Sequence, residues 1–414
     1  MLLRLLLIVL TVLVVAIAII GYTPMPDGLQ DPHKTQILMG VMKIMFFVMN
    51  LKQIFGYESW HNNLRNFQGE ITLEGDLPSA KYGDVKVTRD RVANVPVIVY
   101  RPHTAEELSP ALIFFHGGGW VLGTADEWDL NAYHYAKEAN IIVINVDYRR
   151  APVYPFPIPA QDCLEVTQYV LRHGKTFGID VNKVGVGGDS AGGNLAAVVA
   201  LTLAKEESDL PPLKYQVLSY PALQALDFRL PAYVDNSNTM PILTAKSMAV
   251  FYVLYLGLDD KNAEHYAKIL MENRHISPEF KKSKYSEYVD VEFLPKMFRT
   301  PNKTAPVVTE PYDPQVAAKV EPIIVNPLFS PLMAPDLSGL PPAYVHACEF
   351  DVLRDDALLY ARRLLDAGVM VKTHIGYGGY HADTVKMIPE ILQSQSGKTA
   401  FTLACDFIKS MVKN

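Results

Sequence analysis

The sequence predicts an α/β protein whose central sheet is mostly parallel and is covered by helices on both faces. Two observations predict it. Short, almost continuously apolar segments recur between residues 95 and 375, and segments with apolar residues at helical spacing lie between several of them. Parallel strands are typically apolar along their whole length, because both faces of their sheet are buried. The length of 414 residues fits one large α/β domain with insertions.

The expected strands are short runs of branched and aromatic residues. They cover 95–100, 111–115, 141–146, 183–187, 215–219, 343–347 and 371–375. Helical spacing of apolar residues predicts helices at about 160–173 and 356–367. The interval of about 222–327 breaks the alternation and is rich in proline, tyrosine and methionine, so we expect an inserted cap. The expected organisation is an anchor at 1–21, cap and linker helices at 22–90, and the main α/β domain at 91–414.

The N-terminus carries an unbroken apolar run at residues 5–20. With its flanks this run approaches the roughly 20 residues that span a bilayer. Arg4 precedes it, whereas Asp27 and Asp31 follow it, so the positive-inside bias places the N-terminus in the cytosol and the body in the lumen. A cleaved secretory signal is the alternative, because residues 16–18 have the small-x-small form of a cleavage site. Both interpretations place the body in the secretory pathway.

A second apolar stretch covers residues 37–55. Lysine and asparagine residues interrupt it, which makes it a poor second membrane span. The pattern predicts a helix that either packs on the body or lies in the headgroup region of a membrane, and both readings stay open.

Composition excludes several classes of protein. Hydrophobic residues make up 49% and charged residues 20%, which excludes a disordered chain. The formal net charge of −6 offers no basic field to a nucleic acid. Cys163, Cys348 and Cys405 allow at most one disulfide and match no zinc-binding spacing. The sequon Asn302-Lys303-Thr304 makes Asn302 the candidate glycosylation site.

The chemistry begins at residues 188–192, Gly-Asp-Ser-Ala-Gly, between an expected strand and an expected helix. In that context Gly-x-Ser-x-Gly forms a tight turn that points the serine out of the sheet. A dinucleotide-binding turn starting at Gly185 is the competing interpretation. It fails because Ser190 occupies the third glycine position of Gly-x-Gly-x-x-Gly. Ser190 is therefore the candidate nucleophile.

A glycine-rich segment, His116-Gly-Gly-Gly-Trp, follows directly on the strand that ends at residue 115. The tetrahedral intermediate of acyl transfer carries an oxyanion that needs backbone N–H donors about 3 Å away. Three glycines let the main chain approach that oxygen. We therefore expect the oxyanion hole at His116, Gly117, Gly118 and Ala191, with the N–H groups of Gly117, Gly118 and Ala191 as the donors.

A serine nucleophile needs a basic histidine, which in this arrangement comes last in the chain order serine, acid, histidine. His381 follows the glycine-rich residues 376–380, which we expect to be a loop after the last strand. The other histidines after Ser190 fall in the expected cap or inside expected strands. His381 is therefore the candidate base.

The candidate acid lies between Ser190 and His381. Asp351 comes just after the strand that ends near residue 348, and Glu349 is its close competitor. Asp355 and Asp356 begin the next helix, where we expect them to act as caps. We therefore choose Asp351.

Taken together, these motifs resemble the hormone-sensitive-lipase family of α/β hydrolases, and within it the arylacetamide deacetylase and neutral cholesterol ester hydrolase group. The matching stretches are residues 22–27, 116–120, 148–152, 156–157, 188–197, 220–224 and 351–356. The resemblance covers nearly the whole chain. It implies the α/β-hydrolase fold with a cap, a single-pass type II anchor in the endoplasmic reticulum membrane, and a luminal hydrolase with the triad Ser190, Asp351 and His381.

The chain departs from the family at two positions. Ala382 stands where the family usually has a glycine after the basic histidine, which affects the loop beyond His381. In some members the cysteine that corresponds to Cys348 pairs with one just after the glycine-rich motif. Val121 stands at that second position, so we expect that disulfide to be absent.

The expected function is hydrolysis of lipophilic carboxylic esters through an acyl-enzyme, with arylacetamides as a further substrate class. No metal or organic cofactor is needed, and the expected partners are a small lipophilic ester or lipid and the membrane, with no nucleic acid. One alternative is a neutral lipid or cholesterol ester hydrolase. Another is a ligand-binding protein on a hydrolase scaffold, such as the plant gibberellin receptors, which resemble this family. Those receptors lack the catalytic histidine, whereas every triad candidate is present here.

Overall fold

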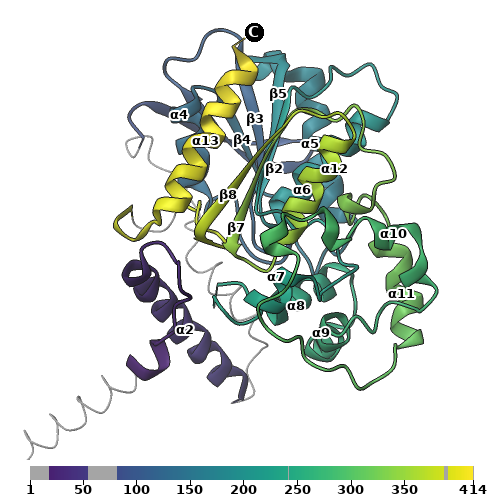
Figure 1. Ribbon diagram of the computed structural model, residues 1–414. Helices are drawn as coiled ribbons and strands as arrows, with labels where there is room; N and C mark the ends of the chain where they lie inside the picture. Colours follow the sequence, from purple (N-terminus) through teal and green to yellow (C-terminus); the bar gives the residue numbers. More distant parts are fainter. Residues whose placement is uncertain (1–17, 55–81, 241, 387–389, 414) are drawn as a thin grey trace, which may run out of the picture.

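The computed structural model describes residues 18–54, 82–240, 242–386 and 390–413. Its centre is an eight-stranded sheet with the strand order β1-β2-β4-β3-β5-β6-β7-β8 (Figure 1). The strands are β1 (Val85–Val92), β2 (Val95–Pro102), β3 (Ser109–Phe115), β4 (Ile142–Val146), β5 (Ile179–Asp189), β6 (Tyr215–Ser219), β7 (Ala343–Phe350) and β8 (Val371–Tyr380). From β4 to β8 all neighbours are parallel, whereas β1 and β2 pair antiparallel at one edge. The mostly parallel sheet predicted from the sequence is confirmed.

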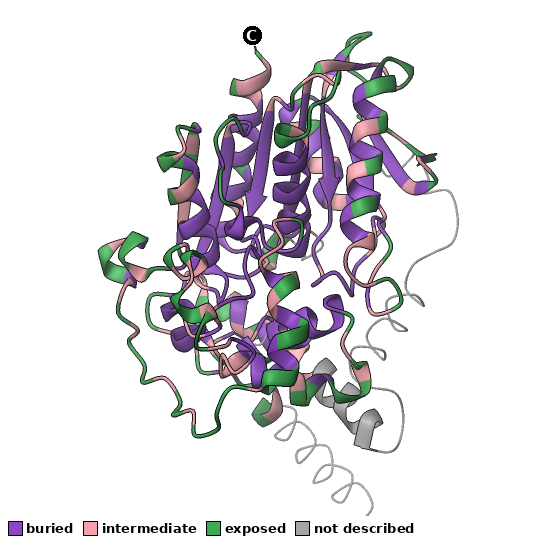
Figure 2. Ribbon diagram, turned by 90° about the vertical axis from the view of Figure 1, so that its right-hand side faces the viewer, coloured by how far each residue is buried: buried purple, intermediate pink, exposed green. Residues whose placement is uncertain are grey.

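The two faces of the sheet are covered by different helices, and β3 shows why its sequence is continuously apolar. Ala111, Ile113 and Phe115 belong to one apolar cluster and Leu112 and Phe114 to the other, because successive side chains of a strand point to opposite faces. The first cluster includes residues of α5 (Ile158–His173), α6 (Ala191–Lys205) and α12 (Arg354–Asp366). The second includes residues of α4 (Asp129–Ala139) and α13 (Gln395–Val412). Figure 2 shows the sheet buried between these layers.

The expected cap is a helical region inserted between β6 and β7. Its helices are α7 (Pro231–Asn236), α8 (Ala245–Tyr255), α9 (Ala263–Met271), α10 (Lys284–Glu287) and α11 (Pro314–Ile324), and Figure 1 shows them together at one end of the sheet. Several of its aromatic side chains, including Tyr233, Tyr252 and Tyr255, are completely buried. These tyrosines therefore form the core of the cap.

The N-terminal residues that the structure describes lie against the same end of the molecule. Helix α2 (Pro32–Ile54) forms in the stretch that the sequence predicts to be helical. Met39 is fully buried in a small apolar cluster with Met240 and Tyr380, whereas Val41 is 62% exposed. Part of this helix therefore packs on the body. None of the helices within the described residues is long and apolar enough to cross a membrane, and residues 1–17 of the expected anchor lie outside the described residues.

Two boundaries differ from the expectation. The sheet begins with β1 at Val85, so the expected domain start at residue 91 falls inside a strand. Residues 376–380, expected to be a loop, belong to β8. Gly376 pairs with Cys348 and Tyr380 with Phe350, so the strand continues up to the residue before His381.

Candidate active site

Ser190 lies in a strained turn between β5 and α6, with φ 55° and ψ −120°. Its backbone N–H donates to the carbonyl of Ser219 at 2.9 Å, which fixes the turn against the neighbouring strand. A methyl group at Gly188 would overlap the backbone of Gly192, and one at Gly192 would overlap the carbonyl of Phe115. The close approach of strand and helix therefore requires glycine on both sides of the serine.

The structure brings the three predicted triad residues together. His381 Nε2 lies 3.0 Å from Ser190 Oγ, and His381 Nδ1 lies 2.7 Å from Asp351 Oδ2. All three side chains are buried, and the second oxygen of Asp351 accepts the N–H of Leu353 at 3.0 Å. A carboxylate at Nδ1 favours the tautomer that carries its proton there, which leaves Nε2 free to accept the serine proton.

The competitor for the acid has another role. Glu349 Oε2 accepts the backbone N–H of Gly378 at 2.7 Å, so this side chain fastens β8 to β7. Of the histidines set aside, His346 lies in β7 and His374 in β8, and His275 is buried in the cap.

The expectation that Asp355 and Asp356 cap helix α12 is wrong. Asp355 accepts the N–H of Ala232 at 2.7 Å, and Asp356 accepts the N–H of Leu223 at 3.0 Å and the amide of Gln224 at 2.9 Å. Burial raises the pKa of Asp356 to about 8. Both carboxyl groups therefore hold the chain where it enters the cap.

The glycine-rich segment forms a loop beside the turn of Ser190. Its conformation requires glycine, because Gly118 and Gly119 have φ values of 115° and 62°. The N–H of Gly117 donates to Asp189 Oδ1 at 3.1 Å. Because this bond engages the group, we correct the expectation that the N–H of Gly117 faces the oxyanion.

The donors left are the N–H groups of Gly118, Gly119 and Ala191. Within the described part of the chain none of these three groups donates a hydrogen bond to another protein atom. The N–H of Gly119 was not among the expected donors, although Gly119 is the third glycine of the motif. Asp189 was also missed as a loop-holding residue, because only the folded loop brings Gly117 to its carboxyl group. Burial raises the pKa of Asp189 to about 7.

His116 shapes this loop from inside. Its ring stacks on Tyr148 with 4.3 Å between ring centroids, and its Nδ1 lies 2.7 Å from the carbonyl oxygen of Gly117. Burial, with Arg150 nearby, lowers the pKa of His116 to about 4. The neutral ring therefore donates from Nδ1 to the carbonyl oxygen, and its part in the predicted oxyanion hole is to fix the backbone.

Asn302, the candidate glycosylation site, is exposed on the cap segment between α10 and α11. Its amide donates to Asp235 Oδ2 at 3.3 Å. Cys163, Cys348 and Cys405 are all free and buried.

Comparison with known proteins agrees with this geometry. A family model described as the α/β hydrolase fold matches residues 112–283 and 303–384. The chain is 34% identical to arylacetamide deacetylase of Oryctolagus cuniculus over 90% of this chain and 93% of that protein. It is 33% identical to neutral cholesterol ester hydrolase 1 of Rattus norvegicus over 90% and 91% of the two chains. The crystal structure of an esterase of Pyrobaculum calidifontis superposes with a TM-score of 0.61 at 27% identity, covering 89% of this chain and 98% of that one. The chain therefore belongs to the esterase family of α/β hydrolases, in the group of the arylacetamide deacetylases and neutral cholesterol ester hydrolases.

Proposed function

We propose that this protein is a serine carboxylesterase that hydrolyses lipophilic esters through an acyl-enzyme, anchored by its N-terminal segment in the endoplasmic reticulum membrane with the catalytic body in the lumen. The observation that carries the chemical part is the chain of contacts Ser190–His381–Asp351, at 3.0 and 2.7 Å. Ser190 is the nucleophile, His381 the general base and acid, and Asp351 the group that orients His381.

The reaction has two halves. His381 Nε2 takes the proton of Ser190 as Oγ attacks the ester carbonyl carbon, and Asp351 stabilises the imidazolium that forms. The N–H groups of Gly118, Gly119 and Ala191 stabilise the oxyanion, and one such donor is worth on the order of 3 kcal/mol of barrier. The alcohol leaves with the proton from His381, and a water molecule activated by the same histidine then releases the acid.

A lipophilic substrate is supported by the surroundings of the triad. Phe350 directly precedes Asp351, and Tyr380 directly precedes His381. Both aromatic side chains belong to or pack on the apolar cluster that includes Met39 of α2. Phe251 of α8 packs against the glycine loop, because a methyl group on Gly119 would meet its ring. Apolar groups from the N-terminal region and the cap thus surround the polar residues of the site, a composition that suits apolar ligands.

The first experiment is labelling of the full chain with a fluorophosphonate probe, followed by hydrolysis of p-nitrophenyl esters from acetate to palmitate. We expect labelling of the wild type and none of Ser190→Ala, with highest kcat/KM for short and medium acyl chains. The matched control is Ser219→Ala, which removes another buried serine side chain next to the turn. A folded wild type that neither labels nor hydrolyses any ester contradicts the proposal and leaves the ligand-binding reading.

A second candidate is a neutral lipid or cholesterol ester hydrolase, favoured by the 33% identity to neutral cholesterol ester hydrolase 1. Hydrolysis of emulsified cholesteryl oleate separates the two. Turnover of sterol ester comparable to that of p-nitrophenyl butyrate selects the second candidate, whereas activity confined to the soluble esters selects the first.

The location is tested on the same full chain expressed in animal cells. We expect the protein to stay in the pellet after carbonate extraction, and its body to resist protease added to sealed microsomes. Endoglycosidase H is expected to shift the wild type and not Asn302→Gln, because Asn302 is exposed on the body. Release into the carbonate supernatant contradicts the anchor, and digestion in sealed microsomes contradicts the luminal orientation.

A further inference from the structure

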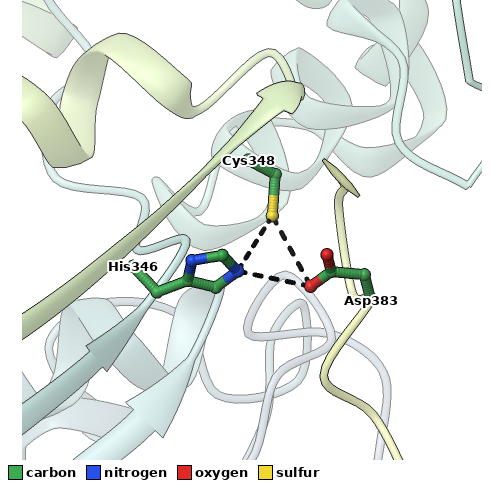
Figure 3. A group of neighbouring side chains, drawn as sticks. All are labelled: His346, Cys348 and Asp383. Atoms are coloured by element: carbon green, nitrogen blue, oxygen red, sulfur yellow. Dashed lines mark hydrogen bonds and ion pairs between the residues drawn. The ribbon is translucent and has the colours of Figure 1, made fainter. Parts of the chain in front are cut away.

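Three side chains that can bind a metal ion meet next to the triad. They are His346 and Cys348 of β7 and Asp383, which follows β8 (Figure 3). His346 and Cys348 are two residues apart on one strand, so their side chains point to the same face of the sheet. All three are at most 2% exposed. The catalytic contacts described above use none of them.

The distances among the three atoms match a tetrahedral ion. His346 Nε2 lies 3.3 Å from both Asp383 Oδ1 and Cys348 Sγ, and Sγ lies 3.6 Å from the same Oδ1 (Figure 3). An ion with tetrahedral bonds of about 2.0–2.1 Å to nitrogen and oxygen and about 2.3 Å to sulfur holds its ligands about 3.3–3.6 Å apart. One ion can therefore contact all three atoms without moving the side chains.

The hydrogen-bonding roles of these atoms also favour a cation between them. His346 Nδ1 lies 3.3 Å from the carbonyl oxygen of His374, an atom that can only accept, so Nδ1 carries a proton. Nε2 faces Asp383 Oδ1 at 3.3 Å, where a proton shared with the ring joins the two atoms as an ion pair. A cation bound to Nε2 and Oδ1 takes the place of that proton and also contacts Cys348 Sγ. A histidine fixed at Nδ1 by a backbone carbonyl is also the usual state of a histidine that binds metal through Nε2.

A second observation comes from the other side of the cluster. Asp383 Oδ2 and Ser396 Oγ are buried, and neither has a hydrogen-bond partner among the described residues. A methyl group on Gly379 would lie 2.7 Å from that carboxylate oxygen, and one on Gly376 would lie 2.8 Å from Cε1 of His346. Because residues 376 and 379 are glycines, no side chain from either enters the region beside the cluster. Asp383 Oδ2 and Ser396 Oγ, which lack hydrogen-bond partners among the described residues, lie in that region.

We propose that His346 Nε2, Cys348 Sγ and Asp383 Oδ1 bind one structural Zn²⁺ ion, with the fourth position on the side of Ser396. The mixed nitrogen, sulfur and oxygen donors suit zinc, which accepts all three in tetrahedral sites. Binding converts the Cys348 thiol to a thiolate and releases its proton to solvent. The ion joins β7 to the loop that carries His381, since Asp383 is two residues beyond that base.

The test measures metal in the protein as it is made, because the ligands are fully buried. The full chain is expressed in zinc-supplemented medium, purified and analysed for metal. We expect about one Zn²⁺ per wild-type chain and a loss of at least about tenfold in Cys348→Ser. The matched control is Cys163→Ser, which changes an equally buried free cysteine in α5 and is expected to retain its zinc.

A second measurement does not depend on the variant folding. Wild type grown with Co²⁺ in place of zinc is expected to show the visible bands of tetrahedral cobalt and a thiolate-to-cobalt charge-transfer band. A folded wild type that labels with fluorophosphonate but contains no zinc and gives no cobalt spectrum overturns the proposal. The three proposed ligands are then a hydrogen-bonded cluster without a metal. Metal content and Ser190 labelling are separate readouts, so a failed esterase assay does not decide the metal site.

Discussion

The oxyanion hole gives the sharpest test of the site, through the substitution Gly119→Ala. A methyl group on Gly119 would overlap Cγ, Cδ1 and Cδ2 of the Phe251 ring, because all three atoms would lie well inside the 3.4 Å at which ordinary contacts begin. Relief of the overlap with Cγ therefore requires a movement of about 1 Å by the loop or by α8. Because Phe251 is 8% exposed and packed in the cap, we expect the loop to move.

The size of the effect follows from that displacement. Loss of one oxyanion donor lowers kcat by about 10²- to 10³-fold, and misplacement of a reacting group by about 1 Å has an effect of similar size. The positive φ of 62° adds strain, roughly 1–2 kcal/mol for a residue with a side chain. We expect kcat for p-nitrophenyl butyrate to fall by about 10²- to 10³-fold with little change in KM, because the oxyanion exists only after attack.

Two controls separate the overlap from the strain. Gly339 has φ 73° and open space around it, so Gly339→Ala carries similar strain far from the site and is expected to keep its activity. The double variant Phe251→Ala/Gly119→Ala lacks the ring that the methyl group meets. We expect Gly119→Ala to lower kcat less in the Phe251→Ala background than in the wild type. If Gly119→Ala retains activity within about threefold of wild type, either the loop does not move or the N–H of residue 119 is not an oxyanion donor, and the reasoning is refuted.

Three further predictions concern the triad, the response to pH and the surface of the cap. Asp351→Asn is expected to lower kcat by about 10³- to 10⁴-fold with KM nearly unchanged, because a neutral amide cannot stabilise the imidazolium of His381 as the carboxylate does. Steady-state kinetics measures this effect, and a loss smaller than tenfold contradicts the prediction. His275, buried with its Nε2 2.9 Å from the Ala225 carbonyl, has a pKa lowered by burial to about 4. The unfolded chain therefore binds more protons than the folded chain between pH 6.5 and 4, so the free energy of unfolding decreases as the pH falls through that window. In urea titrations at several pH values, His275→Gln is expected to make this decrease smaller by about 3 kcal/mol at most. Asn302→Gln is expected to leave kcat/KM within about twofold and the melting temperature nearly unchanged, because its side chain is exposed.

The sequence predicts most of the fold and the three triad residues because the relevant signals are local. Buried parallel strands are apolar along their length, and the turn that carries Ser190 needs small residues at fixed spacing. The expectation of a loop at residues 376–380 is wrong, and it arose because three glycine and two tyrosine residues in five positions are typical of a loop. In the structure they pair with the end of β7, a contact between segments far apart in the chain that spacing alone does not reveal.

The partners of buried carboxyl groups were the least predictable part. Asp355 and Asp356 stand where helix caps are common, yet they accept hydrogen bonds from chain segments more than 120 residues away. Asp189 likewise lies 72 residues from Gly117. The proposed zinc ligands show the same limit, because His346 and Cys348 are separated from Asp383 by helix α12 and strand β8. Zinc motifs are recognised by short spacings, and this spacing is too long for such a signal.

The position of the catalytic base depends on an irregularity at the end of β8. Between the pairs Cys348–Gly376 and Phe350–Tyr380, β7 advances by two residues and β8 by four, which forms a bulge just before His381. Gly378 in the bulge has φ 69°.

Two contacts fix this bulge. Glu349 accepts the N–H of Gly378, and the carbonyl of Gly378 accepts the N–H of Gln30 at 3.0 Å. Gln30 belongs to the segment that connects the N-terminal apolar run to α2. The same few residues thus join the end of β7, the basic histidine and the chain nearest the proposed membrane anchor. A displacement of the N-terminal segment relative to the body is therefore expected to move His381 through Gly378. Ser190 is held separately, by the hydrogen bond from its N–H to the carbonyl of Ser219 in β6.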